Sequence, residues 1–294
     1  MGSREPAHKD YKLSVLIPCY NEKDTIEEIV RRVQAVDVPT EIVIVDDGST
    51  DGTRDILRRI EPDVDQVIFH EKNLGKGGAI QTGAKAVTGD YVVIQDADLE
   101  YDPEEYPLLL QSLLSGKADV VYGSRFLSGS PHRVHMYWHR VANGILTLLS
   151  NMVTNLNLTD METCYKVFKT DVLRTIDLSE RGFGIEPQIT ARISQLRCVV
   201  YEIGISYYGR GYEDGKKIGW KDAVWALYCI FKYGFLSRQR TPLAPEFVRA
   251  GAPAIVREAE QINADKENAE KEKAESEVAT LGAGSGATDE YISY

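Results

Sequence analysis

The chain has 294 residues, 43% of them hydrophobic, and a formal net charge of −11 at pH 7. This length and apolar content predict a globular protein with one large core, an α/β domain of ordinary size and an appendage. The acidic balance argues against a general nucleic-acid binder, since such proteins attract phosphates with Lys and Arg. The four cysteines form no C-x-x-C pair, so neither a zinc ribbon nor a disulfide framework is predicted and a reducing cytoplasm fits best.

Short apolar strands alternate with amphipathic helices in the first part of the chain. Strands are predicted at residues 13–17, 41–45, 67–70 and 91–95, and a helix follows each of the first three. The first helix has a capping-box-like start at Asp24 and Glu27. This alternation predicts a mostly parallel sheet with right-handed crossovers, whose ligands bind outside the carboxyl ends of the strands.

Further elements follow, with less regular alternation. Helices are predicted at residues 103–114, 141–158, 185–196 and 222–235, and strands at 118–122, 163–168 and 197–207. A glycine-rich basic loop, YYGRGYEDGKKIGW, precedes the last helix. The apolar run at residues 223–236 is interrupted by Lys232 and is shorter than the ~20 residues of a membrane span. With no secretion signal visible, we expect a cytoplasmic protein that is soluble or peripheral on the cytoplasmic face of a membrane.

The end of the chain has a different composition. Residues 241–294 hold 11 acidic against five basic residues, are rich in Ala, Glu and Lys, and lack a sustained apolar stripe. We therefore divide the chain into a flexible N-terminus (1–12), a globular domain (13–238) and an acidic tail (239–294), which is mobile or helical and has no catalytic role.

Four polar loops fall at the carboxyl ends of the predicted strands: PCYNE, DDGS, NLGKGG and DADLE. Each loop alone is weak evidence for a binding site, since a D-x-D sequence can be a solvated turn and Asp46 can cap the turn that follows it. Their common position on one edge of one sheet favours a binding site. NLGKGGA matches neither G-x-G-x-x-G nor a Walker sequence, which argues against a dehydrogenase or a P-loop enzyme.

The D-x-D sequence follows the most apolar of these strands. Asp96, Asp98 and Glu100 occupy alternate positions, and nothing apolar after Ala97 can bury their carboxylates. Hard oxygen ligands so spaced suit Mg²⁺ or Mn²⁺. The pattern therefore predicts a metal site at the end of a strand.

An ordered series of sequences, VLIPCYNE, VIVDDGSTDGT, NLGKGGAI, VVIQDADLEYDPEE, VVYGSRF and RGYEDGKKIGWKDA, resembles the family 2 inverting glycosyltransferases of GT-A fold, in the dolichyl-phosphate mannose synthase-like branch. The resemblance covers about residues 13–235. It implies that the domain at 13–238 consists of a nucleotide-sugar half (13–122) and an acceptor half (123–238). It implies a Rossmann-like α/β fold and a metal-dependent transfer of a hexose from a UDP- or GDP-linked sugar to a polyprenyl or dolichyl phosphate. The implied partners are the donor, the lipid phosphate, and a membrane surface or membrane protein.

The resemblance also implies roles for residues on the donor side. Asp96 and Asp98 match the metal-binding D-x-D, and Glu100 matches a further ligand, for which many members of the branch have Gln. Arg210 and Lys217 match residues that close over the diphosphate, although a solvated basic loop is the alternative. The remaining matches are Pro18, Tyr20 and Glu22 on the base and ribose side, Asp47 facing the base, and Lys76 touching the nucleotide or a phosphate beside glycines that permit close backbone approach.

On the acceptor side, Arg125 and Arg140 line up with arginines that hold the phosphate of the lipid. A phosphate monoester needs a cationic clamp and already carries a nucleophilic oxygen anion, so no strong general base is required. Asp98, Arg125 and Arg140 are the residues expected to carry the reaction. Glu186 lies where related enzymes have an acid, but a structural role at a helix start is an equal alternative. The histidines His132, His135 and His139 are predicted to be loop or surface residues and not a zinc site.

Two other functions stay open at this point. The same fold could serve a soluble or protein-linked sugar acceptor, which would require a base such as Glu186. A non-catalytic nucleotide-sugar-binding scaffold is the second alternative. The helix at 141–158 and the helix after Trp220 either lie on a membrane surface or pack in the core.

Overall fold

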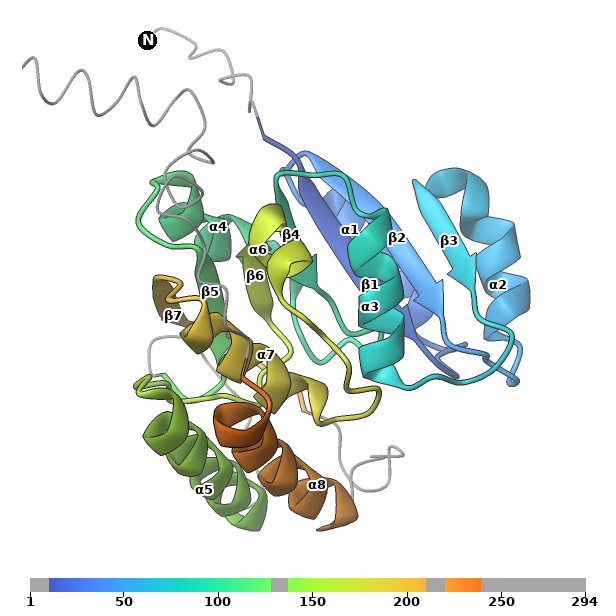
Figure 1. Cartoon of the computed structure of the whole chain (residues 1–294). Helices are drawn as coiled ribbons and strands as arrows, with labels where there is room; N and C mark the ends of the chain where they lie inside the picture. The colour runs from blue at the N-terminus through green and yellow to red at the C-terminus, as the bar shows by residue number, and fades with distance from the viewer. Residues whose placement is uncertain (1–10, 128–136, 210–219, 239–294) are drawn as a thin grey trace, which may run out of the picture. The chain divides into compact units, whose positions relative to one another are not determined.

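The computed structural model of the chain describes residues 11–127, 137–209 and 220–238. The described part contains a seven-stranded sheet in the order β3-β2-β1-β4-β6-β5-β7 (Figure 1). Only β6 among these strands is antiparallel to its neighbours, so the predicted mostly parallel sheet is confirmed. The strands are β1 (Leu13–Cys19), β2 (Thr40–Asp46), β3 (Gln66–Phe69), β4 (Tyr91–Ile94), β5 (Val120–Ser124), β6 (Lys166–Lys169) and β7 (Val200–Gly204).

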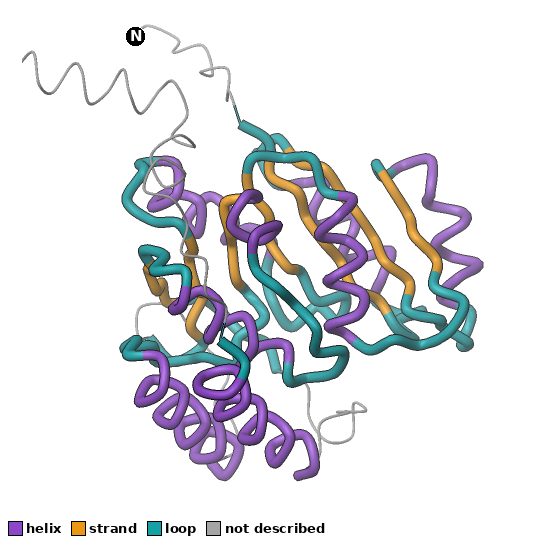
Figure 2. The backbone as a smooth tube through the Cα atoms, in the orientation of Figure 1, coloured by secondary structure: helices purple, strands orange, loops and turns teal. Residues whose placement is uncertain are grey.

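The helices follow the strands as a doubly wound sheet requires. In Figure 1, α3 lies in front of strands β1 and β2 and α1 lies behind them, and Figure 2 shows the same layers by element type. The helices are α1 (Ile26–Ala35), α2 (Thr53–Ile60), α3 (Lys76–Ala86), α4 (Tyr106–Leu114), α5 (Tyr137–Thr154), α6 (Thr170–Thr175), α7 (Ile185–Gln195) and α8 (Trp220–Phe231), with 3₁₀ turns η1 (Glu61–Asp63) and η2 (Pro103–Glu105) and a π-helical turn η4 (Lys232–Leu236).

Several predicted boundaries differ from the observed ones. The capping box at Asp24 and Glu27 is wrong, because α1 begins after Thr25 and no side chain caps it. Helix α5 begins four residues before the predicted start, and β6 and β7 are shorter than the predicted strands. Helix α6 has only six residues, too few for hydrophobic periodicity to indicate a helix.

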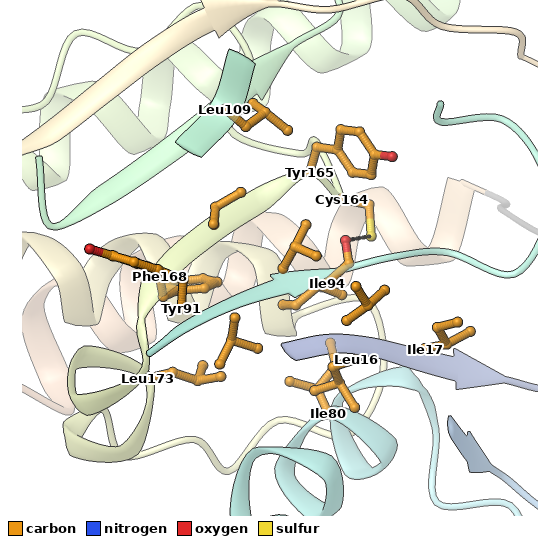
Figure 3. Packing of buried hydrophobic residues seen from close by; sticks show 14 of the residues in the cluster. Leu16, Ile17, Ile80, Tyr91, Ile94, Leu109, Cys164, Tyr165, Phe168 and Leu173 are labelled. Atoms are coloured by element: carbon orange, nitrogen blue, oxygen red, sulfur yellow. Dashed lines mark hydrogen bonds between the residues drawn. The ribbon is translucent and has the colours of Figure 1, made fainter. Parts of the chain in front are cut away.

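The core lies on both faces of the central strands. Leu16, Ile80 and Ile94 pack together between the sheet and α3, and Phe168 of β6 and Leu109 of α4 extend the cluster (Figure 3). All four side chains of β4 are buried, which explains why its sequence is a continuous apolar run. The D-x-D acids that follow are therefore held by a rigid strand.

The carboxyl ends of the parallel strands meet at one edge of the sheet. Asp96 follows β4 and Arg125 follows β5 at this edge. Because β6 runs the other way between these two strands, its first residue, Lys166, lies at the same edge. The topology thus brings acidic and basic side chains from distant parts of the sequence together.

No helix within residues 11–127, 137–209 and 220–238 combines the length and the apolar character that crossing a bilayer would take.

Candidate active site

Two buried tyrosines hold the start of the turn that carries the D-x-D acids, through hydrogen bonds to Gln95. Gln95 is fully buried, and its side-chain oxygen accepts hydrogen bonds from the hydroxyls of Tyr106 and Tyr165, both at 2.7 Å. Its amide donates to the carbonyl of Asp96 at 3.0 Å. Buried polar groups that are satisfied in this way rigidify their surroundings, so Asp96 leaves the strand in a fixed direction.

Asp96 belongs to a chain of alternating charges at the strand edge. Its Oδ1 lies 2.9 Å from Nζ of Lys76, the first residue of α3, and the same ammonium lies 3.5 Å from Oε1 of Glu186. Glu186, at the start of α7, also accepts a hydrogen bond from Lys166. Burial opposes ionisation of Asp96, but the charge of Lys76, hydrogen bonds with Cys164 and Lys76, and the charge of Lys166 together hold the pKa of Asp96 below its ordinary value. The carboxylate is therefore ionised at neutral pH and available to a cation.

The predicted metal ligands do not form a closed three-residue site. Within the described ranges no three His, Cys, Asp or Glu side chains converge in a way that could hold a metal ion. The carboxylate of Glu100 accepts a hydrogen bond from the hydroxyl of Tyr207, while Oδ1 of Asp98 accepts from the backbone N–H of Glu100 at 3.2 Å. Mg²⁺ and similar ions often use one or two carboxylates and complete their shell with substrate phosphates. Asp96 and Asp98 fit such a site, and all three ligands stay predictions.

Asp47 is engaged within the protein. Its two carboxylate oxygens accept hydrogen bonds from the backbone N–H groups of Leu74 and Gly75 at 2.8 and 2.7 Å, and Oδ1 lies 2.8 Å from Nδ1 of His70. The side chain is 3% exposed. Asp47 thus holds the loop before α3, and a contact with a nucleotide base would require these hydrogen bonds to be exchanged. The predicted contact stays a prediction.

Asp46 takes the capping role that the sequence left open. Both of its carboxylate oxygens lie 3.3 Å from the backbone N–H of Ser49, and Arg54 donates to Oδ2 at 2.6 Å. The side chain is fully buried. Asp46 stabilises the turn after β2.

Three predicted nucleotide-side residues lie at the end of β1 and directly after it. Pro18 is within β1, and Tyr20 is 38% exposed just beyond the strand. The backbone N–H of Glu22 donates to Thr53 at 2.9 Å, and its carboxylate accepts from Thr25 at 3.0 Å. They share the sheet edge with Asp96, but their contact with a nucleotide stays a prediction.

The glycines around Lys76 do permit close backbone approach, to the protein's own chain. Gly75 has φ +83°, and a Cβ on Gly77 would meet the carbonyl oxygen of Glu180 at 2.1 Å. The N–H of Gly77 donates to the carbonyl of Arg181 at 2.6 Å. Only glycine leaves room for the backbone at Glu180 and Arg181, and this backbone leads into α7 and Glu186.

The predicted acceptor arginines lie on one aromatic ring. The guanidinium carbon of Arg140, on α5, is 3.8 Å from the centroid of Phe126, and that of Arg125 is 5.4 Å from it. Arg140 is exposed, whereas Arg125 donates two hydrogen bonds of 2.7 Å to the fully buried carboxylate of Asp160. Asn143 of α5 donates to the same carboxylate at 3.1 Å. The structure brings the two arginines together, and among the described residues it shows a carboxylate partner for Arg125 alone.

Tyr207 connects the arginines with the acidic turn, and it was missed by the sequence reasoning. Its ring lies 5.2 Å from the guanidinium carbon of Arg125, and its hydroxyl donates to Glu100. Asp160 and Lys166 were missed as well. For Lys166 a signal existed, since it lies inside the predicted strand at 163–168 and a lysine that is buried in a strand requires a partner.

A second acid, Glu162, is partly buried and lies near Glu186. The Oε1 atoms of both carboxylates are buried and make no hydrogen bond with the described residues. Burial raises the pKa of Glu162 to about 7, with a further rise from the charge of Glu186 that Lys166 and Arg125 partly offset. The site therefore contains a carboxyl group that titrates near neutral pH.

Some predicted residues lie outside the described residues: Arg210, Lys217, His132 and His135. His139 lies on α5 and is partly exposed. The tail at 239–294 and the N-terminus to residue 10 also lie outside, so the predicted division into domains stays a prediction.

Comparison with known proteins identifies the family. Residues 14–177 match the family described as glycosyl transferase family 2. The chain is 29% identical over 216 residues to an undecaprenyl-phosphate mannosyltransferase from Micrococcus luteus, covering 71% of this chain and 88% of the relative. It is 28% identical over 214 residues to a dolichol-phosphate mannosyltransferase from Pyrococcus furiosus, covering 70% of this chain and 60% of the relative.

The fold is shared with a solved structure, the glucosyl-3-phosphoglycerate synthase of Mycobacterium tuberculosis in complex with Mn²⁺, uridine diphosphate and glucosyl-3-phosphoglycerate. The TM-score is 0.60 at 20% identity, covering 76% of this chain and 80% of that one. The chain belongs to glycosyl transferase family 2. The predicted family, GT-A fold and enzyme class are therefore confirmed.

Proposed function

We propose that this protein transfers a hexose from a UDP- or GDP-linked donor to a polyprenyl or dolichyl phosphate, with inversion at C1. The two relatives named as polyprenyl-phosphate mannosyltransferases support this acceptor class. The observation that carries the proposal is the placement of Arg125 and Arg140 on the ring of Phe126, with Tyr207 linking Arg125 to the acidic turn. A phosphate held by two arginines there would lie beside the donor site.

On the donor side, the acidic turn and Lys76 would hold the diphosphate. A divalent cation such as Mg²⁺ or Mn²⁺, held by Asp96 and Asp98 with Glu100 as the further predicted ligand, would neutralise charge on the departing nucleoside diphosphate. Lys76 supplies a second positive charge next to Asp96. The proposal keeps Arg210 and Lys217 as residues that close over the diphosphate, and Pro18, Tyr20, Glu22 and Asp47 as the nucleoside side.

The reaction is a single displacement. An oxygen of the acceptor phosphate attacks C1 of the sugar, and the bond between C1 and the donor phosphate oxygen breaks as the nucleoside diphosphate leaves with its electron pair. A phosphate monoester is largely a dianion at neutral pH, so no proton has to be removed. The chain needs only to position the two phosphates and stabilise the charge that moves between them.

In this proposal residues 13–238 carry the enzyme and residues 239–294 are an appended acidic tail. The lipid acceptor would place the enzyme at the cytoplasmic face of a membrane as a peripheral protein. The chain spans 60% of the length of the Pyrococcus relative, so the complete activity of that longer protein is not assigned to this chain.

A transfer assay tests the proposal. Full-length protein is incubated with polyprenyl phosphate, Mn²⁺ and radioactive GDP-mannose, UDP-glucose or UDP-N-acetylglucosamine in turn. A chloroform-soluble radioactive product from one donor supports it, and its loss in Arg140→Ala ties it to the arginines. A donor that is hydrolysed or used with water-soluble acceptors, with no lipid product from any donor, contradicts the lipid acceptor.

Transfer to a hydroxyl acceptor is the second candidate function, and the raised pKa of Glu162 is the observation that favours it. A general base works best with a pKa near the operating pH, and that of Glu162 is raised to about 7. Glu186 is less suited to this role because Lys166 and Lys76 both form ion pairs with its carboxylate. Glu162→Gln should spare transfer to a phosphate acceptor but abolish transfer to a hydroxyl acceptor.

A further inference from the structure

The residues that follow β7 connect the two sides of the candidate site. The backbone N–H of Ile205 donates to the carbonyl of Ser124 at 3.0 Å, and Ser124 directly precedes Arg125. Three residues further along, the N–H of Tyr208 donates to the carbonyl of Glu100 at 2.9 Å. The segment between these two contacts therefore runs from the end of β5, where the predicted acceptor arginine lies, to the acidic turn after β4.

Tyr207 is the side chain of this segment that contacts both sides. Its hydroxyl donates a hydrogen bond to the carboxylate of Glu100, and its ring centroid lies 5.2 Å from the guanidinium carbon of Arg125. The ring of Tyr101 packs on it with 5.1 Å between the centroids, and Tyr207 is only 6% exposed. The side chain thus lies buried between an acid predicted to bind the metal and an arginine predicted to bind the acceptor phosphate.

On the donor side, the hydroxyl of Tyr207 reaches the least closely matched of the three predicted metal ligands. A carboxylate has two oxygens, so Glu100 can accept from Tyr207 with one of them and approach a cation with the other. Oδ1 of Asp98 accepts from the backbone N–H of Glu100 at 3.2 Å, which ties the two acids within one turn. Groups that hydrogen-bond to a ligand from outside the coordination shell fix its orientation, and losing one typically weakens metal affinity by about 10- to 100-fold.

On the acceptor side, the ring of Tyr207 helps to fix the plane of a guanidinium. Nε and Nη2 of Arg125 each donate to Asp160 at 2.7 Å, so among the described residues the Nη1 side is the one left for an incoming phosphate. The rings of Tyr207 and Phe126 lie 5.2 and 5.4 Å from the guanidinium carbon. Stacking on aromatic faces restrains an arginine and attracts its charge, so these rings keep Nη1 in one orientation.

We propose that Tyr207 is a positioning residue for both halves of the active site: its hydroxyl orients Glu100 towards the divalent cation of the donor, and its ring orients Arg125 towards the acceptor phosphate. This inference rests on the proposed function and adds to it the side chain that sets donor and acceptor groups relative to each other. Because the hydroxyl and the ring serve different halves, removing one of them and removing both have different consequences.

Two variants of the full-length protein separate the contacts. Tyr207→Phe removes the hydroxyl and keeps the ring, whereas Tyr207→Leu removes both. Calorimetric titration of Mn²⁺ into each protein with excess UDP, and in a parallel series with excess GDP, measures metal affinity without acceptor or turnover. We expect Mn²⁺ to bind about ten-fold more weakly to both variants. At saturating Mn²⁺, the KM for the acceptor phosphate should stay unchanged in Tyr207→Phe and rise about five-fold in Tyr207→Leu.

Tyr233→Phe is the matched control. The hydroxyl of Tyr233, on η4, is also buried and also donates to a carboxylate, that of Glu180, which lies outside the acidic turn. This variant should lose a similar amount of Tm and keep its Mn²⁺ affinity. A double variant tests whether the hydroxyl acts through Glu100: Tyr207→Phe combined with Glu100→Ala should bind Mn²⁺ no more weakly than Glu100→Ala alone.

The sign of the change in Mn²⁺ affinity decides the inference. Unchanged affinity in Tyr207→Phe overturns it, and so does tighter binding, because the hydroxyl would then hold Glu100 away from the cation. An equal loss in Tyr233→Phe also overturns it, and an unchanged acceptor KM in Tyr207→Leu overturns the role of the ring. If no donor gives a lipid product but Tyr207→Phe still loses Mn²⁺ affinity, the contact with Glu100 is supported and the proposed acceptor is overturned.

Discussion

The ammonium of Lys76 lies 2.9 Å from Oδ1 of Asp96, and this contact joins the first turn of α3 to the acid that follows β4. Both side chains are only about one-fifth exposed. In a site that excludes much of the water, such a cation acts strongly on any phosphate that approaches. In the proposed function, this pair would hold the donor side in place before the donor binds.

Lys76→Met should lower kcat/KM for the donor by about 100-fold, the scale of losing one charged group that stabilises a transition state. Asp96 and Glu186 would lose the cation between them, so some loss of Tm is expected as well. Steady-state kinetics at varied donor concentration measure the effect. Lys85→Met is the control, because Lys85 is exposed at the other end of α3. Wild-type kinetics in Lys76→Met would show that this lysine has no role in donor binding.

The two acceptor arginines should respond differently to truncation. Arg140 is exposed and stacks on Phe126, so Arg140→Ala should leave Tm unchanged and raise KM for the acceptor phosphate about ten-fold or more. Arg125→Ala should also lower the free energy of unfolding by about 3–5 kcal/mol, because the buried carboxylate of Asp160 loses its cationic partner.

A double variant separates the two effects of Arg125. Asp160→Asn combined with Arg125→Ala removes the uncompensated charge and should recover part of the lost stability, as measured by urea unfolding. Transfer to the lipid phosphate should stay low. Recovery of activity in the double variant would show that Arg125 is only a partner of Asp160.

Glu162 should make stability depend on pH between about 4.5 and 7. Its pKa is raised to about 7 in the folded protein, so in this window the folded state binds a proton that the unfolded state has released. Stability from this group is present below pH 4.5 and is lost as pH rises through 7. The Gln side chain of Glu162→Gln is neutral at every pH. The Tm of this variant minus that of wild type should therefore increase from pH 5 to pH 8.

The size of this effect is up to a few kcal/mol, because each unit of pKa difference corresponds to about 1.4 kcal/mol. Glu61→Gln is the control for a carboxylate on the surface, and it should shift Tm equally at both pH values. A difference between Glu162→Gln and wild type that is constant from pH 5 to pH 8 would count against a raised pKa.

Two glycines should give stability changes of opposite sign. A Cβ at Gly77 would meet the carbonyl oxygen of Glu180 at 2.1 Å, so Gly77→Ala should destabilise the fold by about 1–3 kcal/mol. On α5, Gly144 has open space around it, and Gly144→Ala should stabilise by about 0.5–1 kcal/mol. Thermal unfolding of both variants checks the pair. Equal changes would mean that the segment after Ser179 moves away without cost.

The sequence by itself determined the alternating elements and the position of the polar loops. Apolar runs such as residues 91–94 and the turn formers around Gly48 and Gly75 act locally, so strand ends can be read from neighbouring residues. Because parallel strands end on one edge, the D-x-D acids and Lys76 could be assigned to one site from the sequence, whereas Arg125 was assigned through the family resemblance. The resemblance to the glycosyltransferase family rested on the order of these loops.

Only the tertiary structure decided the partners of these side chains. Tyr207 reaches Glu100 from 107 residues away, and Arg125 meets Asp160 from 35 residues away. Such pairings depend on how the strands are ordered, and the antiparallel insertion of β6 that places Lys166 at the site has no local signal. The exposed apolar faces of α5 and α8 were equally out of reach, because periodicity shows that a helix has an apolar side but not whether the core or the surroundings receive it.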